Sequence, residues 1–155
     1  MFSVAGFSVI VTGGTKGIGK GIARVFVLSG ANVLVSGRDE KGGLNTCADL
    51  NALGKGRCSF FQGDVSSLAD CKRMAEMACT LYGGIQVLCC NAGVIPTHKI
   101  SEMTEENIGS TFDINIKGTF KEHTTLIISS LIFFLSIIIT ILIFIYFLLL
   151  FIIYK

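Results

Sequence analysis

The residues of this chain that are best placed to do chemistry lie near its start. Residues 12–19 read Thr-Gly-Gly-Thr-Lys-Gly-Ile-Gly, between a short apolar run and an apolar pattern with helical spacing. Glycines between a strand and a helix let the backbone approach a pyrophosphate, whose charge the backbone amides and the positive end of the helix stabilise. A glycine-rich chain can contain such a loop by chance, so the surrounding elements have to support the interpretation.

The elements that would position this loop alternate along the chain. Strands are predicted over residues 7–11, 32–36, 57–62 and 85–90. Apolar residues at helical spacing predict helices over 17–28 and 68–82, and a polar segment with a sparse apolar face covers 39–53. Strands that are almost wholly apolar and alternate with helices indicate an α/β fold, in which helices cover both faces of a parallel sheet.

Polar motifs follow the carboxyl ends of all four predicted strands. Ligands of such sheets bind outside these strand ends. The motifs are the loop at 12–19, then Gly37-Arg38, Asp64-Val65 and Asn91-Ala92-Gly93. Their common placement predicts one shared site.

Together with Asn115-Ile116-x-Gly118, these motifs resemble the ordered signatures of the short-chain dehydrogenase/reductase family. The resemblance covers residues 1 to about 122, roughly the first half of a typical member. It implies a truncated Rossmann-like fold with a doubly wound parallel sheet. It also implies that Asp64 contacts adenine and that Asn115 holds a proton-relay water. The segment 91–93 would border the ribose and steady the fourth strand.

The expected site has two parts. The cofactor-binding residues are expected to be Thr12, Gly13, Thr15, Lys16, Gly17, Ile18, Gly19, Arg38, Asp64, Val65, Asn91, Ala92 and Gly93. The expected catalytic residue is Asn115. One departure is Cys90, where members of the family often have a second Asn before the Asn-Ala-Gly triplet.

Charge at the end of the second strand favours NADP(H) over NAD(H). A carboxylate there would accept the ribose hydroxyls of NAD, but the position is Gly37, and Arg38 follows it. The planar guanidinium suits a 2′-phosphate, and Lys16 adds a second cation. The alternative is that Arg38 is a solvated surface charge and that Asp39 or Glu40 selects the cofactor.

The family's catalytic pair is missing from this sequence. The resemblance implies a Tyr activated by a Lys four residues later, but no Tyr-x-x-x-Lys occurs here. Residues 127–130, Ile-Ile-Ser-Ser, look like the strand that carries the family's Ser, but they follow Asn115 too closely. We expect an oxidoreductase that transfers hydride between NADP(H) and an unknown carbonyl or secondary alcohol, in a truncated form. The alternative is a catalytically inactive, membrane-anchored nucleotide-binding or interaction protein.

The C-terminal part of the sequence divides the chain into two. Residues 1–122 are predicted to be an NADP(H)-binding half-domain and 123–155 a hydrophobic tail with a C-terminal helix. The uncharged stretch 126–154 exceeds the roughly 20 residues that span a bilayer, and nearby lysines favour a cytoplasmic N-terminal domain with a membrane anchor. The competing interpretation is mistranslated sequence, because residues 141–155 use only amino acids that A/T-only codons encode.

Composition excludes other classes of function. The net charge of +2 is small and the basic residues are scattered among acidic ones, so nucleic-acid binding is not expected. The six cysteines form no Cys-x-x-Cys pair, and the two histidines have no metal-ligand spacing. We therefore expect no metal site, and buried free thiols in a reducing compartment.

Overall fold

A single parallel sheet forms the centre of the molecule in the computed structural model, which describes residues 3–97 and 99–129. Its strands are β1 (Ser8–Thr12), β2 (Asn32–Gly37), β3 (Arg57–Gln62) and β4 (Val87–Cys89), in the order β3-β2-β1-β4. β1 pairs in parallel with both β2 and β4, and Val11 lies between Val35 and Cys89. The predicted strands and the parallel sheet are confirmed, with strand ends shifted by no more than two residues.

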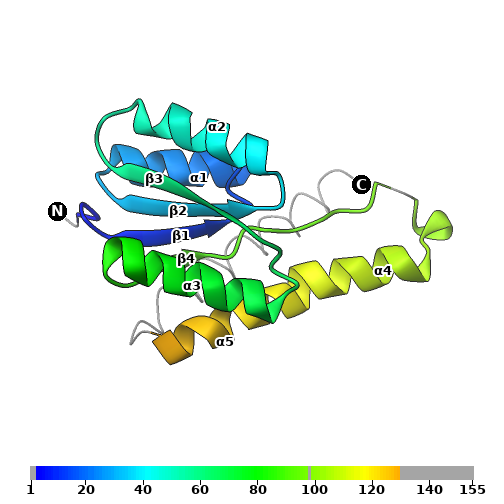
Figure 1. The fold of residues 1–155 in the computed structure, drawn as a ribbon. Helices are drawn as coiled ribbons and strands as arrows, with labels where there is room; N and C mark the ends of the chain where they lie inside the picture. Colours follow the sequence, from blue (N-terminus) through cyan, green and yellow to red (C-terminus); the bar gives the residue numbers. More distant parts are fainter. Residues whose placement is uncertain (1–2, 98, 130–155) are drawn as a thin grey trace.

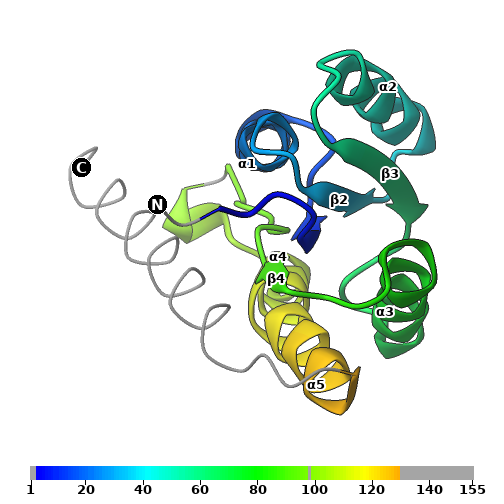
Figure 2. The same ribbon diagram turned by 90° about the vertical axis from the view of Figure 1, so that its left-hand side faces the viewer.

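Helices cover both faces of this sheet (Figures 1 and 2). α1 (Gly17–Leu28) and α2 (Glu40–Asn51) pack on one face, and α3 (Leu68–Tyr82) covers the other, with α5 (Thr119–Ser129) beside it. The polar segment predicted over 39–53 is therefore a helix. A short 3-10 turn at Ile100–Glu102 precedes α4 (Glu105–Thr111), which lies beyond the carboxyl ends of the strands.

The strand at the centre of the sheet, β1, has an apolar interior because both of its faces are buried. All five residues of β1 are buried. Val9 and Val11 pack into the cluster beneath α1 and α2, whereas Ile10 packs into the cluster beneath α3. Neither face of the strand meets water, so the strand shows a continuous apolar run in place of an alternating pattern.

Short polar side chains fix where the helices begin. Asp39 accepts a hydrogen bond from the Gly42 N–H at 3.0 Å at the start of α2, and Ser67 accepts one from the Asp70 N–H at 3.3 Å at the start of α3. α3 ends at Gly83, whose left-handed φ of 81° suits glycine. These caps mark the first turns of α2 and α3 and the end of α3.

A π-helical segment, η2 (Phe112–Gly118), joins α4 to α5. α5 runs through the boundary predicted at residue 122, and the division into 1–122 and 123–155 stays a prediction. Residues 127–129 are helical, so they do not form the Ser-bearing strand of the family. Within the described residues, no helix is long and apolar enough to cross a membrane. Most of the predicted anchor, residues 130–154, lies outside the described residues.

Candidate functional site

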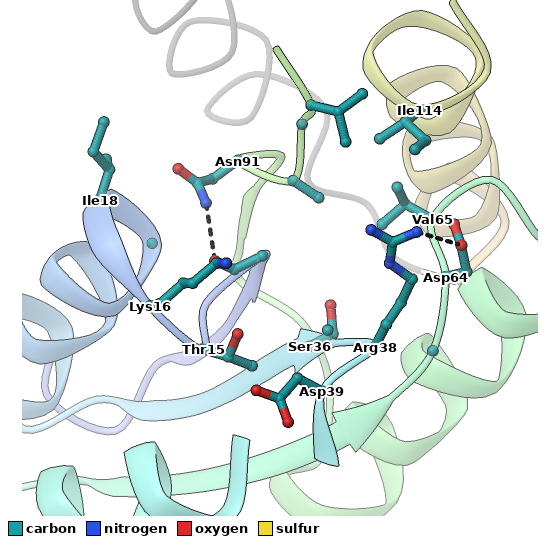
Figure 3. A pocket seen from close by; sticks show the side chains of 17 residues that line it. Thr15, Lys16, Ile18, Ser36, Arg38, Asp39, Asp64, Val65, Asn91 and Ile114 are labelled. Atoms are coloured by element: carbon teal, nitrogen blue, oxygen red, sulfur yellow. Dashed lines mark hydrogen bonds and ion pairs between the residues drawn. The ribbon is translucent and has the colours of Figure 1, made fainter. Parts of the chain in front are cut away.

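A cleft of about 420 Å³ lies at the carboxyl ends of the four strands (Figure 3). The loops after β1, β2, β3 and β4 all contribute to its wall. Every expected cofactor-binding residue lines the cleft except Thr12 and Gly17. The structure thus brings together motifs that are up to 80 positions apart, as the strand-end rule predicts.

The loop after β1 exposes backbone to the cleft. Lys16 is the extended N-cap of α1 and gives it no side-chain hydrogen bond, so the first amides of the helix are available to an anion. Gly17, the first helical residue, has a left-handed φ of 53°. A Cβ at Gly19 would lie 2.3 Å from the Gly13 carbonyl oxygen. Only glycine at position 19 allows the start of α1 to pack this closely against Gly13.

Thr12 joins the end of β1 to the segment after β4 through hydrogen bonds. Its side chain is fully buried, and its hydroxyl oxygen accepts hydrogen bonds from the Asn91 and Ala92 N–H groups, each at 3.1 Å. The Asn91 amide donates in return to the Thr12 carbonyl at 2.9 Å and to the Gly13 carbonyl at 3.3 Å. Thr12 thus positions the residues that line the cleft without lining it.

The end of β2 carries a cation and has little room for a side chain at Gly37. The Arg38 guanidinium lies 3.9 Å from the Asp64 carboxylate at one side of the cleft, and 68% of the Arg38 side chain is exposed (Figure 3). A Cβ at Gly37 would lie 2.9 Å from the Thr15 methyl group. Asp39 lines the cleft as well, but its carboxylate also caps α2.

Hydrogen bonds from α3 and α5 fix the loop after β3. The Asp64 N–H donates to the Asp70 carboxylate at 2.9 Å, and this hydrogen bond, helped by Arg73, lowers the pKa of Asp70. On the other side, the Lys121 ammonium of α5 donates to the Ser66 carbonyl. These contacts present Asp64 and Val65 to the cleft on a fixed backbone.

Asn115 lies beside the cleft in the π-helical segment η2. Its amide nitrogen donates to the Val94 carbonyl at 2.8 Å, and its amide oxygen accepts from the Val94 N–H at 2.8 Å. Segments of π-helix are frequent at functional sites, because the wider turn redirects backbone and side chains. The side chain of Asn115 therefore fixes the segment after β4 against the helix, and its neighbour Ile114 lines the cleft.

Sequence reasoning missed one buried acid, Glu122. Only 2% of Glu122 is exposed, and the Thr12 hydroxyl lies 3.5 Å from its carboxylate, in hydrogen-bonding geometry. Burial raises the pKa of Glu122 to about 8, against hydrogen bonds from Cys90 and Thr12 that lower it. No local signal marks Glu122, because charged residues are usually exposed and its partner Thr12 lies 110 positions away in the sequence. Cleft residues that the motifs also omitted are Ser36, Gly63, Val94 and Ile114.

Tyr82 cannot serve as the acid of this cleft. Its hydroxyl donates to the carbonyl of Val33 at 3.2 Å, near the amino end of β2, whereas the cleft lies at the carboxyl ends. Within residues 3–97 and 99–129, no tyrosine lines the cleft. Among the described residues, no cluster of His, Cys, Asp and Glu could hold a metal ion.

The sequence and the fold both match known proteins. The family model for short chain dehydrogenase matches residues 8–132. The chain is 34% identical to the 3-oxoacyl-[acyl-carrier-protein] reductase FabG of Chlamydia muridarum, over 76% of this chain and 48% of the relative. It is 36% identical to the oxidoreductase UcpA of Salmonella typhimurium, over 77% of this chain and 45% of that protein.

Solved structures show the same arrangement. The RhlG/NADP active-site complex of Pseudomonas aeruginosa superposes with a TM-score of 0.74 at 29% identity, covering 81% of this chain and 48% of that one. A short chain dehydrogenase of Burkholderia cenocepacia in complex with NADP gives 0.76 at 23% identity, over 83% and 52%. This chain spans about half the length of the curated relatives it matches. The strand order, the glycine loop and the family match agree, and the chain belongs to the short-chain dehydrogenase family.

Proposed function

We propose that the cleft binds a nicotinamide dinucleotide and prefers NADP(H) to NAD(H). The observation that carries this proposal is the pairing of a glycine loop at the start of α1 with a cation at the end of β2. Backbone amides and the helix dipole would hold the pyrophosphate. Two similar proteins, from Burkholderia cenocepacia and Pseudomonas aeruginosa, are NADP complexes, which supports the same class of ligand.

Preference for the 2′-phosphate follows from the surroundings of Gly37. Its Cβ would lie 2.9 Å from the Thr15 methyl group, so this position accommodates a carboxylate poorly. Arg38, at the rim of the cleft, can form two parallel charge-assisted hydrogen bonds to a phosphate. The Asp39 carboxylate accepts the Gly42 N–H, which engages one of its oxygens in a helix cap. These contacts favour Arg38 as the selecting residue over Asp39.

The parent activity that we propose is reversible hydride transfer between NADP(H) and a carbonyl or secondary alcohol. Relatives described as an oxidoreductase and as a 3-oxoacyl-[acyl-carrier-protein] reductase support this reaction class. When bound, the nicotinamide would supply or accept the hydride. The residues of this chain would hold the dinucleotide, and Asn115 would keep the segment after β4 in place beside the nicotinamide end of the cleft.

Binding without catalysis is the second candidate. The sequence has no Tyr-x-x-x-Lys, and Tyr82 lies away from the cleft. A positioned general acid typically contributes roughly 10²–10⁴ in rate, so its loss removes most of the turnover and leaves binding intact. NADPH binding by the full chain with no carbonyl-dependent oxidation of NADPH would support this candidate.

The test of the cofactor proposal is a titration of the purified full chain with NADPH and with NADH. Arg38→Asp should weaken NADPH binding by about 2 kcal/mol or more, and change NADH binding much less, because only NADPH carries the 2′-phosphate. Arg57→Asp is the matched control, since Arg57 is an exposed cation at the opposite end of the sheet. Equal losses for both cofactors would show that Arg38 does not recognise the phosphate.

A further inference from the structure

Two buried cysteines on different elements are in contact outside the cleft. The sulfur of Cys47, on α2, lies 3.4 Å from the sulfur of Cys58, on β3. Their residue exposures are 8% and 5%. A buried thiol is a small apolar group that keeps a weak S–H donor, and here each of the two thiols lies in contact with the other.

The contact between these thiols is built into the packing of α2 on β3. Asn51, at the end of α2, donates from its amide to the Cys58 carbonyl at 2.9 Å and accepts the Cys58 N–H at 2.7 Å. This pair of hydrogen bonds fixes the register of the helix against the strand. Cys71, which is also buried, has a backbone partner instead of a thiol: its thiol donates to the Val65 carbonyl at 3.5 Å.

The two thiols are not equivalent. A hydrogen bond from the Cys58 thiol lowers the pKa of Cys47, against the opposing effect of burial, whereas the same contact raises the pKa of Cys58 together with burial. The thiolate is the reactive form of cysteine. Cys47 is also the more exposed of the two, at 8% against 5%, so we assign it as the attacking sulfur of the pair and Cys58 as the resolving one.

α2 also connects this pair to the cleft. Thr46 directly precedes Cys47, and its hydroxyl donates to the carbonyl of Thr15 in the glycine loop at 2.8 Å. A disulfide requires sulfurs about 2.05 Å apart, so bond formation must draw them more than 1 Å closer than they are here. Movement of α2 toward β3 would strain or break the Thr46–Thr15 hydrogen bond, because closely packed elements transmit displacement.

We propose that Cys47 and Cys58 form a reversible disulfide on reaction with a hydroperoxide, and that this bond weakens dinucleotide binding through Thr46. The Cys47 thiolate attacks a peroxide oxygen, the O–O bond breaks, and a sulfenic acid forms with release of hydroxide, which takes up a proton to become water. The Cys58 sulfur then attacks the Cys47 sulfur, its proton leaves with the hydroxyl group as a second water, and the S–S bond forms. Two thiols are oxidised and one hydrogen peroxide is reduced to two waters.

The first arm of the experiment treats the full chain with hydrogen peroxide and maps the products without reduction. Intact mass should fall by two hydrogen atoms and recover with dithiothreitol. Trypsin separates Cys47, in residues 42–55, from Cys58, in 58–72, and the second peptide also contains Cys71. The linked peptide should persist in Cys71→Ala and disappear in Cys47→Ala and in Cys58→Ala. Linkage to Cys71, or sulfinic acid at Cys47 without linkage, would overturn the proposal.

The second arm measures NADPH affinity in the reduced and oxidised chain, and it rests on the proposed function. Oxidation should weaken binding several-fold in the unmodified chain and leave Cys47→Ala/Cys58→Ala unchanged. Thr46→Val, which lacks the hydroxyl, should begin with weaker binding and respond less to oxidation. Unchanged affinity in a fully disulfide-bonded chain would refute the coupling. If the reduced chain does not bind NADPH, the proposed function fails, and the peptide map still decides whether the disulfide exists.

Discussion

At the scale of single residues, the candidate site depends on glycines, which have no Cβ, as much as on its polar side chains. Gly13, Gly19 and Gly37 each border a neighbour so closely that a Cβ would come within 3 Å of it. Two of these neighbours are backbone groups, which cannot rotate away. The glycine spacing in the sequence therefore encodes a close approach of β1, α1 and the segment after β4, and that approach forms the floor of the cleft.

Gly19 and Gly21 offer a matched comparison within one helix. Gly19→Ala would place its Cβ 2.3 Å from the Gly13 carbonyl oxygen and 2.5 Å from the Asn91 amide, whereas a Cβ at Gly21 meets nothing within 4 Å. We expect Gly19→Ala to lower the free energy of unfolding by about 1–3 kcal/mol and to abolish NADPH binding. Gly21→Ala should stabilise the chain by up to about 1 kcal/mol, because alanine favours helix. Urea denaturation and NADPH titration of both variants measure this, and similar behaviour of the two would contradict the close packing.

Glu122 makes the stability of the chain depend on pH. Its pKa is about 8 in the fold and 4.5 as the ordinary value, so the folded state keeps a proton that the unfolded state has released between these limits. The stabilisation is complete below about pH 4.5 and is lost as pH rises to about 8, at up to about 1 kcal/mol per pH unit.

Glu122→Gln tests this dependence, because glutamine is neutral at every pH. Urea denaturation between pH 5 and about 8 should give a slope for the unmodified chain that is larger than the slope for the variant. Glu76→Gln, on the exposed side of α3, serves as the control and should keep the original slope. Parallel curves for the unmodified chain and Glu122→Gln would mean that the carboxyl is not buried as described.

At the scale of elements, the sequence predicts most of the sheet and misses the form of the helix beside it. Apolar runs identify β1, β2 and β4 because both faces of the sheet are covered there. Polar residues at strand ends locate the cleft for the same topological reason. The π-helical turn of η2 has no such local pattern, since it depends on Asn115 meeting Val94 from a different part of the chain. The burial of Glu122 is equally invisible locally, because charged residues are usually exposed.

The π-helical segment should depend on the two hydrogen bonds of Asn115. Asn115→Ala leaves the Val94 N–H and carbonyl without these partners, which should cost about 1–3 kcal/mol of unfolding free energy. Amide exchange at Val94 should become faster, because its N–H loses its acceptor. The control is Asn107→Ala, which removes a half-buried capping-box residue of α4 and should cost about 1 kcal/mol without changing exchange at Val94. Protection of Val94 that survives Asn115→Ala would exclude this role.

At the scale of the whole molecule, the cleft for which we propose a dinucleotide is formed within the described residues, because all four strands supply their loops to it. Helices α3 and α5 and the π-helical segment support that cleft from one side of the sheet. The match covers about half the length of the curated relatives, so their activities extend to this chain only as proposals. The cleft and its cofactor can be tested on this chain alone, independently of any substrate.

The stretch 126–154 gives the last prediction, which concerns where the full chain partitions. Its 29 positions contain no charged residue, and helices of roughly 20 apolar residues span a bilayer, so we expect the expressed full chain to resist carbonate extraction from membranes. Ile139→Asp should oppose insertion by about 2.5–3.5 kcal/mol and shift the chain out of the membrane fraction, whereas Ile139→Val should leave it there. The driving force is about 25 cal/mol per Å² of apolar surface removed from water. Release of the unmodified chain by carbonate as a monomer would show that this surface is buried against protein instead of lipid.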